Sequence, residues 1–228
     1  MLEFLFIDLD DTILDFHKAE RVALSKSLEA FGITPTEAVC ARYSQINREH
    51  WQRLERGELT REQVLLGRFA ALLTELGTAV PAEQIAAAYE RNLSVGHYFL
   101  PGAKEALEAL HGTYKLYLAS NGTARVQAGR LESANISRFF ENIFISQLLG
   151  ANKPSRAFFD RCFAEIPGFS RDRAMMVGDS LTSDILGGIN AGIATCWVNP
   201  KGAPRREDIH VDYEIKALSE LEGLLNTL

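Results

Sequence analysis

Short apolar runs that alternate with helical stretches constrain the fold of this chain more than any other feature. Residues 4–8 form an apolar run, typical of a strand buried on both faces. Further strand-like runs occupy residues 114–120, 142–146, 174–179, 194–199 and 213–215. Helices are expected between or after them, near residues 102–111, 123–134, 155–165, 182–191 and 217–226. This alternation predicts an α/β fold, a parallel sheet whose strands are joined by crossover helices.

Residues 16–95 break the alternation, because they have helical patterns only. Turn-like segments such as "FGITP" and "LGTAVP" divide them into four stretches. Apolar residues fall on one face of these stretches, as with Leu65, Phe69 and Leu72. We therefore expect an all-helical domain of residues 16–95, inserted into an α/β domain formed by residues 1–15 and 96–228.

Polar residues follow the apolar runs. Asp8, Asp10 and Asp11 end the first, although closely spaced carboxylates repel and lose solvation beside a buried strand. The later runs are followed by "SNG" at 120–122, "NKP" at 152–154 and "GDSLTSD" at 178–184. Ligands of open α/β sheets bind beyond the carboxyl ends of the strands. The sequence thus predicts one polar site at this edge.

The chemistry of these residues suits a hard cation. Mg²⁺ prefers oxygen ligands, and several aspartates are gathered here. A calcium-binding EF-hand loop beginning at Asp8 is excluded, because Ile13 and Ala19 occupy the positions that require glycine and glutamate. Pro154 suits the first position of a helix, so Lys153 is expected to project from a helix start.

Four motifs now suggest a family. "DLDDTI", "SNG", "KP" and "GDSLTSD" resemble, in order, the motifs of the haloacid dehalogenase (HAD) superfamily. Most members are Mg²⁺-dependent phosphatases that work through an aspartyl-phosphate. The resemblance covers the whole chain and implies a Rossmann-like parallel-sheet core, with residues 16–95 as a C1-type helical cap.

The resemblance also implies catalytic roles for three residues. Asp8 would be the nucleophile, because a carboxylate held beside a cation can attack phosphorus. Asp10 would act as a general acid and then as a general base. Lys153 would neutralise the charge of the phosphoryl group.

Binding roles follow from the same motifs. The phosphoryl oxygens would be bound by Thr12, Ser120, Asn121 and Lys153, and Mg²⁺ by Asp8, Asp179 and the backbone carbonyl of Asp10. Asp184 would either support the metal ligands and Lys153 without binding the ion, or cap the helix that follows.

A narrower resemblance concerns the substrate. "MVGDSLTSDILGGINAGIATCWVN" and "QINREHWQRLERGELT" resemble bacterial pyrimidine 5′-nucleotidases. This implies a small phosphomonoester substrate, a nucleoside 5′-monophosphate with a pyrimidine base. Candidates for contacting the base or ribose are Phe16, His17, Asn47, Trp51 and Arg68. Each has a structural alternative: Trp51 more often packs in a core, Arg68 more often pairs with an acid, and the others could belong to the packing or the solvated surface of a helix.

Other functions compete with a nucleotidase. The enzyme could be a phosphatase of sugar phosphates or of many small phosphomonoesters, or a phosphomutase. A different alternative is a non-catalytic protein that binds a phosphorylated ligand, since a fold alone does not establish an activity. Asp10 and Asp179 disfavour a metal-free dehalogenase.

Composition limits the partners. The formal net charge of −6 disfavours a broad basic surface, so no nucleic acid polymer is expected. No apolar run reaches the roughly 18 residues of a membrane span, so no membrane association is expected. The three widely spaced cysteines fit reduced thiols in a cytoplasmic protein. The oligomeric state stays open.

Overall fold

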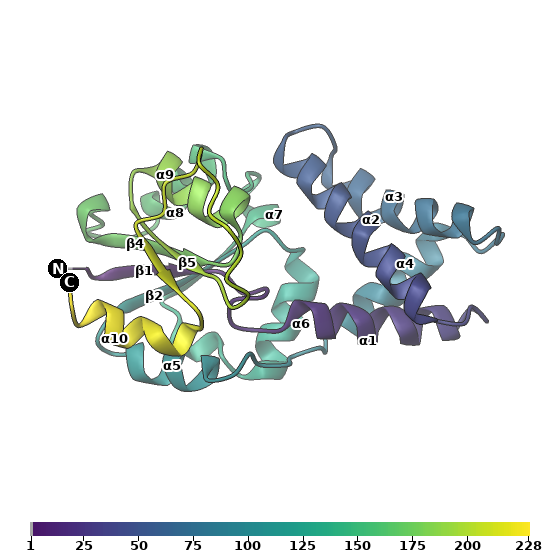
Figure 1. The fold of residues 1–228 in the computed structure, drawn as a ribbon, viewed down its shortest axis with the longest axis horizontal. Helices are drawn as coiled ribbons and strands as arrows, with labels where there is room; N and C mark the ends of the chain where they lie inside the picture. Colours follow the sequence, from purple (N-terminus) through teal and green to yellow (C-terminus); the bar gives the residue numbers. More distant parts are fainter. Residues whose placement is uncertain (1) are drawn as a thin grey trace. The chain divides into compact units, whose positions relative to one another are not determined.

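The computed structural model describes residues 2–228 and separates into two compact units. The α/β unit comprises Met1–Phe16 and His97–Leu228, and the helical unit comprises His17–Gly96. Figure 1 shows both as ribbons. Their roles as catalytic core and cap stay predictions.

The α/β unit is built on a six-stranded sheet in the order β3-β2-β1-β4-β5-β6, and all neighbouring strands are parallel. The strands are β1 (Phe4–Ile7), β2 (Lys115–Ser120), β3 (Asn142–Ile145), β4 (Ala174–Gly178), β5 (Ala194–Val198) and β6 (Tyr213–Ile215). The predicted α/β fold is therefore confirmed. The central position of β1, between β2 and β4, brings the polar motifs after these strands to one edge.

Helices cover both faces of this sheet (Figure 1). They are α5 (Ala103–Leu110), α6 (Ala124–Ala134), α7 (Ser146–Leu149), α8 (Arg156–Ala164), α9 (Leu186–Ala191) and α10 (Leu221–Leu225). Short 3₁₀ turns lie at Ser137–Phe139, Arg171–Arg173 and Leu218–Glu220, and a π-helical segment, Leu181–Ile185, precedes α9.

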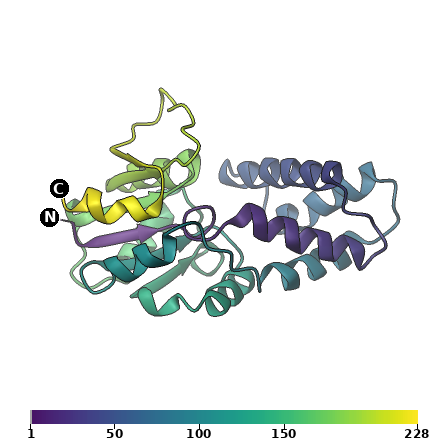
Figure 2. The same ribbon diagram turned by 60° about the horizontal axis from the view of Figure 1, so that its bottom comes forward.

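Alternating side chains of β1 explain why both faces are covered. Leu5 and Ile7 pack in the cluster that includes α5, α6 and α10, whereas Phe4 and Phe6 pack with α8 and α9. Figure 2 turns α5 and α10 toward the viewer, in front of the sheet. A strand that buries every side chain must be apolar throughout, which is what residues 4–7 show.

The helical unit contains most of α1 (Phe16–Glu29), with α2 (Glu37–Glu55), α3 (Arg61–Glu75) and α4 (Ala82–Leu93). Thr36 and Thr60 cap α2 and α3 through their side chains. The interior holds Tyr43, Phe69 and Tyr89, whose ring centroids lie 5.0–5.6 Å apart. This unit therefore has its own packed core.

The two crossings between the units are hydrogen-bonded to each other within the α/β unit. The Asp15 amide donates to the Tyr98 carbonyl at 2.7 Å, and the Leu100 amide donates to the Ile13 carbonyl at 3.0 Å. Leu14 and Phe99 form an antiparallel bridge between them. The chain thus leaves and re-enters the α/β unit at neighbouring positions.

Two further observations concern the described residues 2–228. None of their helices has the length and apolar character needed to cross a bilayer. Cys40, Cys162 and Cys196 are buried free thiols. The cytoplasmic location and the lack of a nucleic acid partner stay predictions.

Candidate active site

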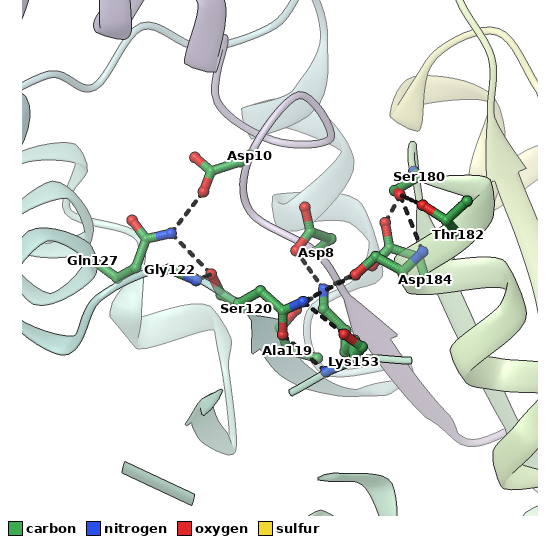
Figure 3. Close-up of polar contacts among 12 residues, drawn as sticks. Asp8, Asp10, Ala119, Ser120, Gly122, Gln127, Lys153, Ser180, Thr182 and Asp184 are labelled. Atoms are coloured by element: carbon green, nitrogen blue, oxygen red, sulfur yellow. Dashed lines mark hydrogen bonds and ion pairs between the residues drawn. The ribbon is translucent and has the colours of Figure 1, made fainter. Parts of the chain in front are cut away.

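Asp8 and Lys153 form the centre of the site, directly after β1. The Asp8 amide continues the sheet by donating to the Val177 carbonyl at 3.0 Å, which fixes where its side chain emerges. Lys153 Nζ donates to Asp8 Oδ1 at 2.6 Å and to Asp184 Oδ1 at 2.7 Å. Figure 3 shows the ammonium group between the two carboxylates. A third bond, to the Ala119 carbonyl, uses the last of its three donors.

Asn121 fixes the backbone of Lys153. Its Nδ2 donates to the Lys153 carbonyl and its Oδ1 accepts from the Lys153 amide, both at 2.9 Å. The expectation that Pro154 occupies the first helical position is wrong. Ser155 is the N-cap and α8 begins at Arg156, so Lys153 projects from the turn that precedes the helix. The proposed contact of Asn121 with phosphate stays a prediction.

Three carboxylates meet at this edge of the sheet. Asp8, Asp179 and Asp184 each place one oxygen so that the three atoms lie within 4.8 Å of one another. Gly178 permits this approach, because a Cβ at that position would lie 2.3 Å from Asp184 Oδ2. The Trp197 indole donates to the Asp179 carbonyl at 2.7 Å and so fixes the backbone after β4.

Asp184 contacts both Lys153 and the start of the π-helical segment, while its support of a metal stays a prediction. Its Oδ2 accepts from the Ser180 amide at 3.0 Å, at the start of the π-helical segment, while its Oδ1 accepts from Lys153. The Ser180 hydroxyl in turn accepts from the Ser183 amide at 3.1 Å. One carboxylate therefore satisfies a helix end and helps to hold the lysine.

The cluster holds three carboxyl groups and one ammonium group. Burial raises the pKa of Asp8 against the opposing effect of Lys153, and Asp184 and Asp10 raise it further. Burial and the neighbouring Asp184 and Asp8 raise the pKa of Asp179. Burial alone would lower the pKa of Lys153, but Asp184 and Asp8 outweigh it and raise that pKa. A hard divalent cation would offset this mutual repulsion, and carboxylate oxygens are ligands that such a cation prefers.

Ser120 and Asp10 are joined by residues that the sequence motifs did not reveal. Gln127 Nε2 donates to Ser120 Oγ at 2.8 Å and to Asp10 Oδ2 at 2.7 Å, as Figure 3 shows. Arg130 forms an ion pair with Asp10 through Nη1 and Oδ1. Both residues lie on α6, three positions apart, on one face of the helix. These polar side chains follow "SNG" by five and eight positions, a signal that sequence inspection could have used.

Thr12 brings a further polar atom to the loop after β1. It is 1% exposed, and its hydroxyl has no hydrogen-bond partner among residues 2–228. An unsatisfied buried hydroxyl is costly, so a bound oxyanion that accepted its proton would stabilise the loop. The predicted phosphate contact is compatible with this placement.

The candidates for base or ribose recognition belong to both units: Phe16 is in the α/β unit and the other four are in the helical unit. In the helical unit, Asn47 and Arg68 are buried together: Asn47 Nδ2 donates to Glu20 Oε1 at 2.7 Å, and Arg68 Nη1 donates to Asn47 Oδ1 at 2.8 Å. Trp51 is half-buried, with the Arg61 guanidinium 5.6 Å from its ring centroid. Their contact with a substrate stays a prediction.

The two remaining candidates lie where the chain passes between the units. His17 is exposed, whereas Phe16 is half-buried, with the Arg130 guanidinium 5.9 Å from its ring centroid. The Phe16 amide donates to Asp11 Oδ1 at 2.9 Å. Asp11 has a positive φ of 55°, so it shapes the loop as a turn residue.

Known proteins resemble this chain over most of its length. A family model described as haloacid dehalogenase-like hydrolase matches residues 3–192. The pyrimidine 5′-nucleotidase PynA of Streptococcus pneumoniae is 35% identical over 225 residues, covering 98% of this chain and 95% of PynA. The pyrimidine 5′-nucleotidase YjjG of Escherichia coli is 32% identical over 223 residues, covering 98% and 97%. The crystal structure of the HAD-hydrolase YfnB of Bacillus subtilis, bound to magnesium, matches with a TM-score of 0.94 and 39% identity, covering 99% of each chain.

Proposed function

Because this chain belongs to the haloacid dehalogenase-like hydrolases and is a phosphatase, we propose that it removes phosphate from pyrimidine nucleoside 5′-monophosphates. The buried contact between Asp8 and Lys153 carries the chemical part of the proposal, since it holds a carboxylate ready to attack phosphorus. The likeness to two pyrimidine 5′-nucleotidases over nearly the whole chain supports the substrate class.

Asp8 is the proposed nucleophile. Its carboxylate attacks phosphorus and forms an aspartyl-phosphate while the bond from phosphorus to the ribose oxygen breaks. Lys153 holds Asp8 through Oδ1, so the carboxylate is oriented before the substrate arrives. Mg²⁺, held by Asp8, Asp179 and the Asp10 carbonyl beside Asp184, would offset the repulsion between this carboxylate and the phosphoryl oxygens.

Asp10 is the proposed acid and base. Asp10 enters the cycle protonated and gives this proton to the departing ribose oxygen; as a carboxylate it then takes a proton from the water that attacks the aspartyl-phosphate, which restores its starting form. The second attack releases inorganic phosphate and restores Asp8. The Asp10 side chain is 27% exposed, which suits a group that must meet a leaving group and a water in turn.

A comparison of substrates tests the proposal. With Mg²⁺ present, kcat/KM should be higher for UMP and dTMP than for AMP and glucose 6-phosphate. Equal values would support a phosphatase for many phosphomonoesters, and a maximum for glucose 6-phosphate would support a sugar phosphatase. Isomerisation of a sugar phosphate without phosphate release would indicate a mutase. Binding of UMP without its hydrolysis would refute UMP as a substrate.

A further inference from the structure

Gln127 and Arg130 lie outside the four motifs, yet both contact residues with proposed roles in phosphoryl transfer. They are 1% and 0% exposed, so neither is a mobile surface group that meets Asp10 by chance. We propose that Gln127 and Arg130 are positioning residues: they aim the Asp10 carboxylate at the leaving group and commit the Ser120 hydroxyl to donating its proton. This role rests on the proposed function.

The hydrogen bonds of Ser120 determine where its proton can go. Its Oγ accepts from Gln127 Nε2 at 2.8 Å and from the Gly122 amide at 3.1 Å. A hydroxyl has two acceptor lone pairs and one proton, so both lone pairs are in use. The proton is then directed away from these two donors. A phosphoryl oxygen is an acceptor without protons of its own, and such a hydroxyl matches it.

Asp10 is oriented through both of its oxygens. Oδ2 accepts from Gln127 at 2.7 Å, and Oδ1 is paired with Arg130. Two donors on different oxygens restrict rotation of a carboxylate about its last torsion more than one donor would. The geometry demanded of a general acid is strict, and an error of about 1 Å can cost ~10²-fold in rate.

Arg130 also determines which way the Gln127 amide points. Arg130 Nη1 donates to Gln127 Oε1 at 3.1 Å. Because the guanidinium has donors only, the amide oxygen faces Arg130 and the NH₂ group faces Asp10 and Ser120. Gln127 thereby spans the carboxylate and the hydroxyl with its two N–H donors, and holds them at a fixed separation.

Gly122 is the third part of this arrangement. A Cβ at position 122 would lie 2.3 Å from Gln127 Nε2 and 2.6 Å from its Cδ. The absence of that atom allows the Gln127 side chain to pass close over the "SNG" loop. The glycine of this motif therefore makes room for a positioning side chain.

The experiment uses unbranched, uncharged replacements in the full-length enzyme with Mg²⁺. The variants are Arg130→Met and Gln127→Met, and the control is Arg125→Met, the same change at an exposed position of α6. The substrates are UMP and p-nitrophenyl phosphate, because a nitrophenolate needs little protonation when it leaves whereas a ribose alkoxide needs it.

Different losses are expected for the two variants. Arg130→Met should lower kcat for UMP about 10-fold to ~10²-fold, because Arg130 orients the general acid Asp10. The loss of kcat for p-nitrophenyl phosphate should be clearly smaller, because its leaving group needs little protonation. Gln127→Met should lower kcat for both esters and weaken inhibition by inorganic phosphate, because it also releases Ser120. Arg125→Met should leave all three measurements unchanged.

A double-mutant cycle separates positioning from a merely structural role. In a variant with Asp10→Asn, adding Arg130→Met should change kcat for UMP by less than about 2-fold. The reason is that the carboxyl group that Arg130 orients is no longer present. The proposal would be overturned if the losses of kcat in Asp10→Asn and Arg130→Met multiplied in the double variant. Equal losses of kcat for both esters in Arg130→Met would also overturn it. If Arg130→Met does not fold, Arg130→Lys takes its place, because lysine keeps the charge but its shorter side chain and single ammonium group cannot reproduce both contacts, with Asp10 and Gln127.

The two proposals can fail separately. A wild-type enzyme that hydrolyses p-nitrophenyl phosphate but not UMP would refute the nucleotide substrate. The cycle is then measured with glycerol 2-phosphate, which also has an alkoxide leaving group, and its outcome still decides the roles of Gln127 and Arg130.

Discussion

Replacing Lys153 by methionine should destabilise the α/β unit strongly. The lysine side chain is 2% exposed, and its ammonium lies 2.6 Å from Asp8 and 2.7 Å from Asp184. Methionine is also long and unbranched, so the change removes the charge and leaves little cavity. Removing one partner of a buried ion pair costs about 3–5 kcal/mol, because the remaining charges stay buried without compensation.

The two tryptophans make it possible to observe one unit alone. Trp51 is in the helical unit and Trp197 is in β5, so a Trp51→Phe background leaves Trp197 to report on the α/β unit. For a chain of this size, 1 kcal/mol corresponds to about 2–4 °C, so Tm in EDTA should fall by roughly 6–20 °C. Mg²⁺ should recover part of the loss, because a cation bound by the carboxylates replaces some of the missing positive charge.

The control is Lys104→Met, which makes the same change on an exposed position of α5 and should leave Tm nearly unchanged. A fall of less than about 2 °C for Lys153→Met in EDTA would refute the reasoning, since it would mean that the cluster does not depend on its lysine. An equal fall in both variants would assign the effect to lost lysine charge in general.

Two further predictions concern the chemistry. Treatment with EDTA should abolish turnover of UMP, and added Mg²⁺ should restore it. The reason is that Lys153 brings a single ammonium group to the cluster of Asp8, Asp179 and Asp184, so a cation is needed to offset the remaining carboxylates. Full turnover in the chelated enzyme would contradict a metal-dependent reaction. Asp8→Asn should form no phosphoenzyme in rapid-quench labelling. Asp10→Asn should form the phosphoenzyme more readily from p-nitrophenyl phosphate than from UMP. It should then hydrolyse the phosphoenzyme about 10²–10⁴-fold more slowly than the wild-type enzyme does. Labelled Asp8→Asn protein would show that the two roles are wrongly assigned.

The elements of the fold could be predicted because their signals are local. A run such as residues 4–7 is apolar throughout, and this alone indicates a strand covered on both faces. The strand order β3-β2-β1-β4-β5-β6 has no such local signal, because it depends on pairing between strands that are far apart in the sequence. The expected strand ends were sufficient to place Asp8, Ser120 and Asp179 at one edge.

The rest of the site depends on contacts between distant segments. Gln127 and Arg130 contact Asp10 across 117 and 120 residues of sequence, so their role could be recognised only once the fold had placed α6 next to Asp10. Pro154 was misplaced because proline and serine both favour helix starts. Ser155 determines the outcome, since its hydroxyl accepts from the Phe158 amide at 3.3 Å and makes Ser155 the N-cap.

The paired crossings at Asp15–Tyr98 and Leu14–Phe99 have a consequence for the inserted segment. Both ends of the inserted segment are joined inside the α/β unit. The contacts between residues 13–15 and 98–100 therefore offset the entropic cost of bringing these ends together, without any contact from residues 17–96. Any domain whose own termini lie close together could be spliced between these positions without rethreading the sheet. Replacing residues 17–96 by such a domain should therefore leave the contacts of Asp8 and Lys153 in place.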